Sequence, residues 1–130
     1  MSGERYLLDT NAIVCLLRGD QALQQRLRQA EWVGISILSQ IEFLAFPNLG
    51  ADDRSIFQQF SASIDVVGLD RAQPDLIDRV VRLRAQYRLK LPDAIIAATA
   101  LERGAILITD DRQLQKLSAV KTTGTSNPNP

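Results

Sequence analysis

The sequence predicts an α/β fold of three layers, in which helices cover both faces of a mostly parallel sheet of about five short strands. The segments that read as strands are short and almost wholly apolar, which is typical of strands buried on both faces. Segments with helical periodicity alternate with them along the chain. A length of 130 residues fits one domain, and its 45% of apolar residues can close a core.

The N-terminal segment begins with an apolar run, Arg5 to Leu8, that predicts a buried strand. Residues Asn11 to Arg18 have helical character. Gly19 interrupts that helix, and Asp20 can cap a second one. The apolar face of the second helix comprises Leu23, Leu27 and Ala30.

The middle of the chain repeats this alternation. The β-branched run Val33 to Ile37 predicts a second strand, and Leu38 to Phe46 predicts a helix that ends before Gly50. Asp52 starts another helix, and Ile64 to Val67 predict a third strand.

Two longer helices follow. Asp70 is expected to open an amphipathic helix. Its apolar side is predicted to carry Leu76, Ile77, Val80, Val81, Arg84 and Tyr87. Pro92 and Gly104 mark the first turn and the C-cap of the next helix. That helix is apolar almost all round, so we expect it to be buried on most sides.

The C-terminal part closes the sheet. Ala105 to Ile108 predict a fourth strand, Asp111 to Leu117 a short helix, and Ala119 to Lys121 a fifth strand. Residues 122–130 are polar and rich in Thr, Asn and Pro, which predicts a disordered tail after a domain of residues 1–121.

Composition excludes several kinds of protein. The chain has no His, which excludes His general bases, Ser-His and Cys-His pairs and His-ligated zinc. Cys15 cannot form an internal disulfide, and its apolar neighbours predict a buried thiol in a reducing compartment. No apolar run approaches the roughly 20 residues of a membrane span, so we expect a cytoplasmic protein.

Acidic residues stand where the predicted strands and helices meet. Asp9 ends the first strand, Asp110 and Asp111 follow the fourth, Asp93 begins the buried helix, and Glu42 lies about one turn into the helix after the second strand. Taken singly, each has an ordinary role as a cap, a turn residue or a polar helix position. Sites in open parallel sheets lie beyond the carboxyl ends of the strands, so the acids are expected to converge there.

Such a cluster favours a divalent cation, because neighbouring carboxylates repel one another unless a cation lies among them. Oxygen ligands without His or Cys suit Mg²⁺ or Mn²⁺. A metal lowers the pKa of a bound water and stabilises charge on phosphate, so the cluster suits phosphodiester hydrolysis. Whether one ion binds or two stays open.

Four motifs resemble those of PIN-domain ribonucleases, in particular the VapC-type toxins of bacterial toxin–antitoxin pairs. They are Leu7-Leu8-Asp9-Thr10-Asn11, Ser39-Gln40-Ile41-Glu42, Leu91-Pro92-Asp93-Ala94-Ile95-Ile96-Ala97-Ala98-Thr99-Ala100 and Leu107-Ile108-Thr109-Asp110-Asp111-Arg112. The resemblance spans residues 5–121. It implies a PIN-like fold and a Mg²⁺- or Mn²⁺-dependent endoribonuclease that cuts single-stranded or looped RNA. It also implies a homodimer and a cognate VapB-like antitoxin that blocks the site.

The resemblance assigns roles to individual residues. The catalytic, metal-binding acids it implies are Asp9, Glu42, Asp93 and Asp111, with Asp110 as the second choice for the fourth. Three polar residues are implied to shape the site by hydrogen bonding: Asn11, Ser39 and Thr109. Basic residues near the acids are candidates for RNA contact: Arg112 is adjacent to the fourth motif, and Arg88, Lys90 and Arg18 lie near the ends of flanking elements. The Phe residues read as core, so no base-stacking platform is predicted.

Three alternatives stay open at this point. A phosphatase of the haloacid dehalogenase class would need a second Asp two residues after Asp9, where the chain has Asn11. A receiver domain would carry its phosphoacceptor after the third strand, where no Asp occurs before Asp70. A non-catalytic scaffold of the same fold would lack metal binding at the acids.

Overall fold

A parallel sheet in the order β3-β2-β1-β4-β5 forms the middle layer of the structure, a computed structural model that describes residues 3–125. The strands are β1 (Arg5–Leu8), β2 (Trp32–Ser36), β3 (Asp65–Val67), β4 (Ile106–Ile108) and β5 (Thr122–Thr123). Every neighbouring pair runs parallel. The predicted α/β class with a five-stranded parallel sheet is therefore confirmed.

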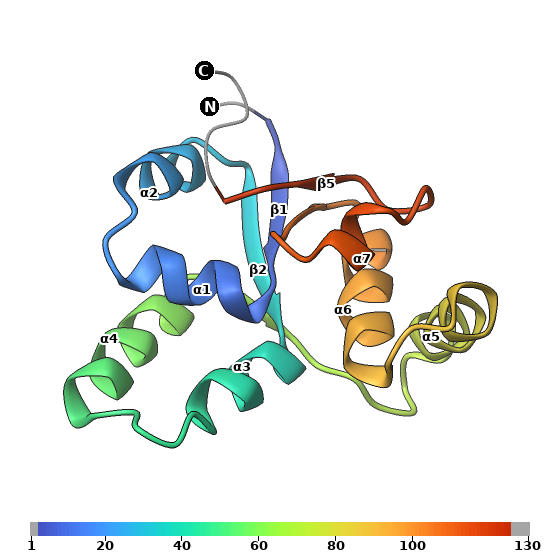
Figure 1. Cartoon of the computed structure of the whole chain (residues 1–130), viewed down its shortest axis with the longest axis horizontal. Helices are drawn as coiled ribbons and strands as arrows, with labels where there is room; N and C mark the ends of the chain where they lie inside the picture. Colours follow the sequence, from blue (N-terminus) through green and yellow to red (C-terminus); the bar gives the residue numbers. More distant parts are fainter. Residues whose placement is uncertain (1–2, 126–130) are drawn as a thin grey trace.

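Helices cover both faces of this sheet (Figure 1). Side chains alternate along a strand, so Leu7 and Leu8 of β1 belong to different cores. The core around Leu8 includes side chains from α1 (Thr10–Leu17), α2 (Gln21–Arg28), α3 (Ile37–Leu44) and α4 (Ala51–Ala62). The core around Leu7 includes side chains from α5 (Pro74–Tyr87), α6 (Leu91–Glu102) and α7 (Arg112–Gln115).

Helix α6 is buried on most sides, as its sequence predicts. Every residue from Ala94 to Ala100 is buried, and the hydroxyl of Thr99 donates to the carbonyl of Ile95 at 2.7 Å. Gly104 follows the helix with a φ of 59°, a left-handed conformation that glycine adopts without strain. Because α6 is packed on most sides, the residues of its first turn, Asp93 among them, have a fixed position.

The predicted limits of α5 are wrong at its start and on its outer face. The helix begins at Pro74, because Asp70 closes a preceding turn by accepting from the backbone N–H of Ala72 at 2.7 Å. The buried stripe is Leu76, Val80 and Leu83. Ile77 and Val81 were predicted on the apolar side but are 38% and 60% exposed. Helix α5 packs mainly on α6, and this single contact covers only one narrow stripe.

The predicted fifth strand is also misplaced. It lies at Thr122–Thr123 and not at 119–121, because Val120 turns into the core while the β-branched threonines pair with β4. The chain segment 122–125, assigned to a disordered tail, is thus placed beside the sheet, and residues 126–130 lie outside the described residues. Arg26 of α2 holds this segment by donating to the carbonyl of Gly124 at 2.8 Å.

Smaller differences lie at element ends. Ile37 begins α3 and does not end β2, because Ser36 caps the helix by accepting from the N–H of Leu38 at 3.1 Å. Asp20 caps α2 as predicted, accepting from the N–H of Leu23 at 3.0 Å. Cys15 is half-buried, not buried. No helix within residues 3–125 has the length and apolar character needed to cross a membrane.

Candidate functional site

The register of the parallel strands brings three chain segments to one edge of the sheet. Leu8 pairs with Ile35 on one side and with Ile108 on the other. The chain therefore leaves β1, β2 and β4 at the same level. Asp9 is the next residue after β1, and its N–H donates to the carbonyl of Ile108 at 3.1 Å. The predicted convergence at the carboxyl ends is thus a direct result of strand order.

Asp9 is a buried carboxylate, with only 6% of the residue exposed. It caps α1, and its Oδ1 accepts from the N–H of Ala12 at 2.8 Å. Burial raises the pKa of Asp9, and the charges of Asp110 and Asp111 raise it further, against the hydrogen bonds from Thr109 and Ala12, which lower it. Asp9 is therefore an ordinary helix cap, and its carboxyl also lies in surroundings that disfavour ionisation.

Glu42 enters the site from α3 and is held by the neighbour of Asp9. The hydroxyl of Thr10 donates to Glu42 Oε1 at 2.6 Å, which joins the start of α1 to the middle of α3. The sequence patterns assign no role to Thr10, although it lies within the first motif. Its partner stands 32 positions away, so only its place directly after Asp9 could have signalled this contact.

Asp93 lies in the first turn of the buried helix α6 and is itself half-buried. Burial raises the pKa of Asp93, as do the charges of Asp111 and Glu42, while Lys90 lowers it. The charges of two of the other predicted acids, Asp111 and Glu42, thus act directly on Asp93. Since Asp111 also raises the pKa of Asp9, the four carboxylates form one electrostatically coupled group.

A pocket of about 250 Å³ lies among these acids, and we call it the acid pocket. Its lining residues are Asp9, Thr10, Asn11, Glu42, Phe46, Asp93, Ile96 and Leu114. Three of the four predicted acids therefore face the same space. Asp111 stands beside it as the cap of α7, with its Oδ1 accepting from the N–H of Gln113 at 2.8 Å.

Asp110 points away from this group and toward the C-terminal segment. Its Oδ1 accepts from the N–H of Thr125 at 3.0 Å, and its Oδ2 accepts from the hydroxyl of Thr125 at 2.6 Å. Its charge raises the pKa of Asp9 but is not among the influences on Asp93. Both oxygens are thus used to hold the segment after β5.

The three predicted polar residues have different surroundings. Thr109 is fully buried, bonds the side chain of Asp9, and accepts from the N–H of Asp111 at 3.0 Å. Asn11 is exposed and lines the acid pocket. Ser39 is fully buried, and within residues 3–125 its Oγ is a buried side-chain atom without a hydrogen-bond partner. Thr109 therefore couples two of the acids, as a positioning residue would.

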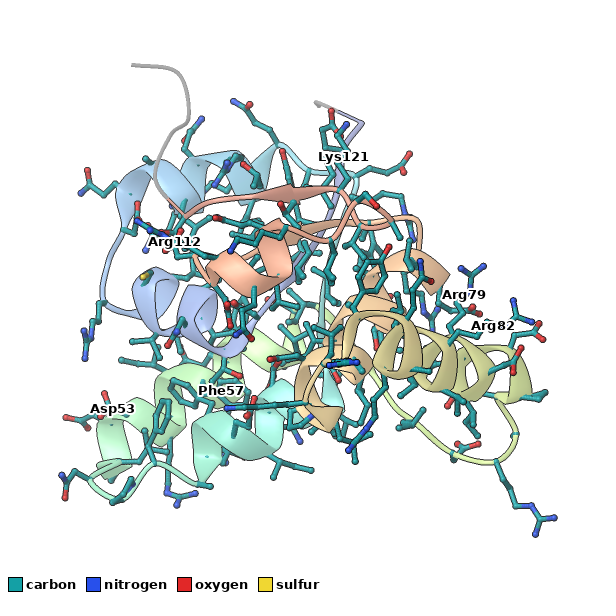
Figure 2. All side chains as sticks on the ribbon, turned by 45° about the vertical axis from the view of Figure 1, so that its right-hand side comes forward. Asp53, Phe57, Arg79, Arg82, Arg112 and Lys121 are labelled. Carbon is teal, nitrogen blue, oxygen red and sulfur yellow. The ribbon has the colours of Figure 1, made fainter. Side chains whose placement is uncertain are left out.

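The predicted basic residues are all exposed, and none lines the acid pocket. Lys90 directly precedes α6, and its charge lowers the pKa of Asp93. Arg112 begins α7 directly after Asp111 (Figure 2). Arg88 ends α5 with a φ of 55°. Arg18 ends α1 and lines a neighbouring pocket.

The donor set fits a hard divalent cation. The coupled groups are all carboxylates, and the raised pKa values of Asp9 and Asp93 record repulsion and burial that a cation would relieve. Within residues 3–125, no three acids already stand in the geometry of a metal site.

The chain is similar to a known protein family and to several solved structures. The family model described as PIN domain matches residues 6–120. A chain of a toxin–antitoxin complex from Klebsiella pneumoniae is 26% identical, with a TM-score of 0.73 over 93% of this chain and 98% of that one. A chain of DNA-bound VapBC from Salmonella typhimurium is 16% identical, with a TM-score of 0.78 over 95% and 99% of the two chains.

A third similar structure, VapBC2 from Rickettsia felis bound to a promoter DNA fragment, has a TM-score of 0.78 at 15% identity and covers 92% of this chain and 98% of that one. No curated protein matched the sequence. The motifs, the strand order, the convergence of the acids and the family match agree, and the chain belongs to the PIN-domain family.

Proposed function

We propose that this protein is a Mg²⁺- or Mn²⁺-dependent endoribonuclease and the toxin of a toxin–antitoxin pair. The observation that supports it most is the coupled group of carboxylates around one pocket, two of which have a raised pKa. Membership of the PIN-domain family favours this function over the phosphatase-like and receiver-like alternatives. An intact set of acids argues against a non-catalytic scaffold.

The residues that would hold the metal are Asp9, Glu42, Asp93 and Asp111. When bound, Mg²⁺ or Mn²⁺ supplies Lewis acidity and neutralises charge at the phosphate. The protein's own contribution is to hold the carboxylates in place. Thr10 orients Glu42 through its 2.6 Å hydrogen bond, and Thr109 bonds both Asp9 and the backbone of Asp111.

Basic groups beside the acids would receive the RNA. Lys90 is exposed and lowers the pKa of Asp93, so it places a positive charge close to that acid. Arg112 is exposed and directly follows Asp111 in the chain. Neutralising phosphates in this way supplies much of the affinity for a nucleic acid, and it does so without reading sequence.

The proposed partner is a VapB-like antitoxin, since the similar structures named above come from toxin–antitoxin or VapBC complexes. An apolar groove of about 490 Å³ between α2, β2 and α4 offers such a partner a surface, with Leu27, Trp32 and Phe60 among its walls. A second copy of the chain is proposed as a further partner on the basis of the resemblance alone.

Expression of the chain in bacteria tests the proposal. The wild type is expected to arrest growth, and sequencing of RNA ends should reveal new 5′-phosphate ends that depend on induction. Asp9→Asn keeps an oxygen to cap α1 but loses the charge, so it is expected to abolish both effects. Growth arrest that persists in this variant would exclude the nuclease mechanism.

Asp111 and Asp110 are expected to respond differently to substitution. Asp111→Asn should lower the rate of RNA cleavage by about a hundredfold, as removal of a charge coupled to Asp9 and Asp93 implies. Asp110→Asn should leave cleavage within about twofold and lower the free energy of unfolding by about 1 kcal/mol, because it weakens the contacts to Thr125. Initial rates and urea denaturation measure both, and the reverse ranking would make Asp110 the fourth acid.

A further inference from the structure

A second pocket adjoins the acid pocket and shares one wall with it. This pocket has a volume of about 130 Å³ and lies between the end of α1, the end of α3 and the start of α4. Phe46 lines both pockets, so a ligand in one pocket lies next to a ligand in the other. We call it the Phe46 pocket.

The Phe46 pocket has an apolar floor and an aromatic side. Leu17, Phe43 and Leu49 supply apolar surface. Phe46 itself is 40% exposed, and its ring lies 5.6 Å from that of Phe43 in a tilted arrangement. The expectation that every Phe is a core residue is therefore wrong for Phe46, which leaves part of its ring open beside the acids.

Two opposite charges complete the lining. Arg18, at the end of α1, and Asp53, in the first turn of α4, are both exposed (Asp53 is labelled in Figure 2). Neither forms an ion pair within residues 3–125, although both line the same pocket. Asp53 Oδ2 also accepts from the backbone N–H of Gly50 at 3.5 Å, which leaves Oδ1 for another donor. Arg18 and Asp53 thus offer a donor and an acceptor that one flat polar molecule in this pocket could engage together.

We propose that the Phe46 pocket binds one guanine base of the RNA, next to the phosphate cut at the acid pocket. This inference rests on the proposed nuclease function and names what that site selects. A volume of about 130 Å³ is well below that of sites for drug-sized ligands, which begin near 300 Å³, and suits a single base. Bases in single-stranded RNA stack on aromatic side chains and are read at their edges.

The two charges select guanine among the bases. Guanine presents two acceptors, O6 and N7, on one edge, where an arginine fork donates to both. It presents donors, N1–H and the 2-amino group, on the adjacent edge, where a carboxylate accepts. A base held between Arg18 and Asp53 and stacked on Phe46 would satisfy all three groups at once.

Cleavage of single-stranded RNAs that differ at one base near the cut tests this inference. The wild type is expected to prefer guanine to adenine by about five- to hundredfold in kcat/KM. Arg18→Ala should remove the preference, and Phe46→Leu should raise KM for every RNA by about fivefold or more, because stacking is lost without regard to sequence. Arg82→Ala is the matched control for a lost surface charge, and Figure 2 shows Arg82 far from Asp53.

Modified bases identify the individual contacts. Replacing guanine by 7-deazaguanine removes the N7 acceptor, so it should slow wild-type cleavage by about fivefold and leave Arg18→Ala unaffected. Hypoxanthine lacks the 2-amino group, so its penalty should disappear in Asp53→Ala. Penalties that are the same in the wild type and in these variants would overturn the proposed contacts.

A binding experiment separates this inference from the nuclease proposal. The charge-removed variant Asp93→Asn, without added metal, is mixed with fluorescent oligoadenylate that carries one central guanine or none. Tighter binding of the guanine-containing strand, lost in Asp93→Asn with Arg18→Ala, supports the pocket even if no RNA is cut. Equal binding of both strands overturns it, as does a result in which Arg18→Ala and Phe46→Leu weaken only the association with a protein partner. Thermal unfolding of each variant checks that it is folded.

Discussion

Asp93→Asn is expected to lower the rate of metal-dependent RNA cleavage by about a thousandfold and, at the same time, to make the metal-free protein more stable at neutral pH. The loss follows because metal sites supply several kcal/mol of charge stabilisation in the transition state, and about 1.4 kcal/mol corresponds to a tenfold rate. The gain follows because burial, Asp111 and Glu42 all raise the pKa of Asp93. A neutral amide removes that unfavourable charge.

Asp75→Asn is the matched control for this prediction. Asp75 follows Pro74 in the first turn of α5, as Asp93 follows Pro92 in α6, but it is exposed and lies outside the acid pocket. It should leave cleavage unchanged and lower stability by about 0.3–1 kcal/mol through loss of a favourable interaction with the helix dipole. Rates measured with excess Mn²⁺ and urea denaturation in chelator give both quantities. Full cleavage by Asp93→Asn would refute the assignment of this acid.

The stability of the metal-free protein is expected to depend on pH through Asp9. Its folded-state pKa lies above the ordinary value of 3.8, so the folded state holds this proton more tightly than the unfolded state. Below that ordinary value both states are protonated and the carboxyl costs nothing. As the pH rises above it, the free energy of unfolding falls, until the folded-state carboxyl also ionises and the cost is complete. Asp9→Asn should therefore melt above the wild type at pH 7, and the difference should vanish as the pH falls toward 4.

A divalent metal ion is expected to offset the loss of stability that the ionised Asp9 causes at neutral pH. At a concentration of 100 Kd, an ion that binds only the folded state stabilises it by about 2.7 kcal/mol. Mn²⁺ at pH 7 should accordingly raise the melting temperature of the wild type and leave that of Asp9→Asn unchanged. Asp20→Asn is the control, since Asp20 caps α2 as Asp9 caps α1 but lies outside the acid pocket. Equal stabilisation of all three proteins by Mn²⁺ would show that the metal binds elsewhere.

The sequence predicts most of the fold because the signals are local. Short apolar runs define the central strands, and the uninterrupted burial of α6 follows from its composition. Errors occur where a tertiary contact outweighs the local pattern. The threonines of β5 pair with β4, and Ile77 and Val81 stay exposed because α5 contacts little besides α6.

The candidate acids are predictable for a related reason. Asp9, Asp93 and Asp111 each stand at the beginning of a helix, where a carboxylate is recognisable from its neighbours in the chain. Because parallel strands have their carboxyl ends at one edge of the sheet, the strand order brings these acids together there. Glu42 has no such local marker, and only the second motif, Ser39-Gln40-Ile41-Glu42, indicates it.

The sequence by itself determined the fold class, the buried helix and the four acids that are candidates for a metal site. Only the tertiary structure decided that Thr10 holds Glu42, that Asp110 turns to Thr125 while Asp111 stays coupled to Asp9 and Asp93, and that Phe46 opens beside the acid pocket. The reason is physical. Caps and apolar periodicity depend on residues a few positions apart, whereas these contacts join segments distant in the chain, and the direction of each side chain is set by the packing of its neighbours.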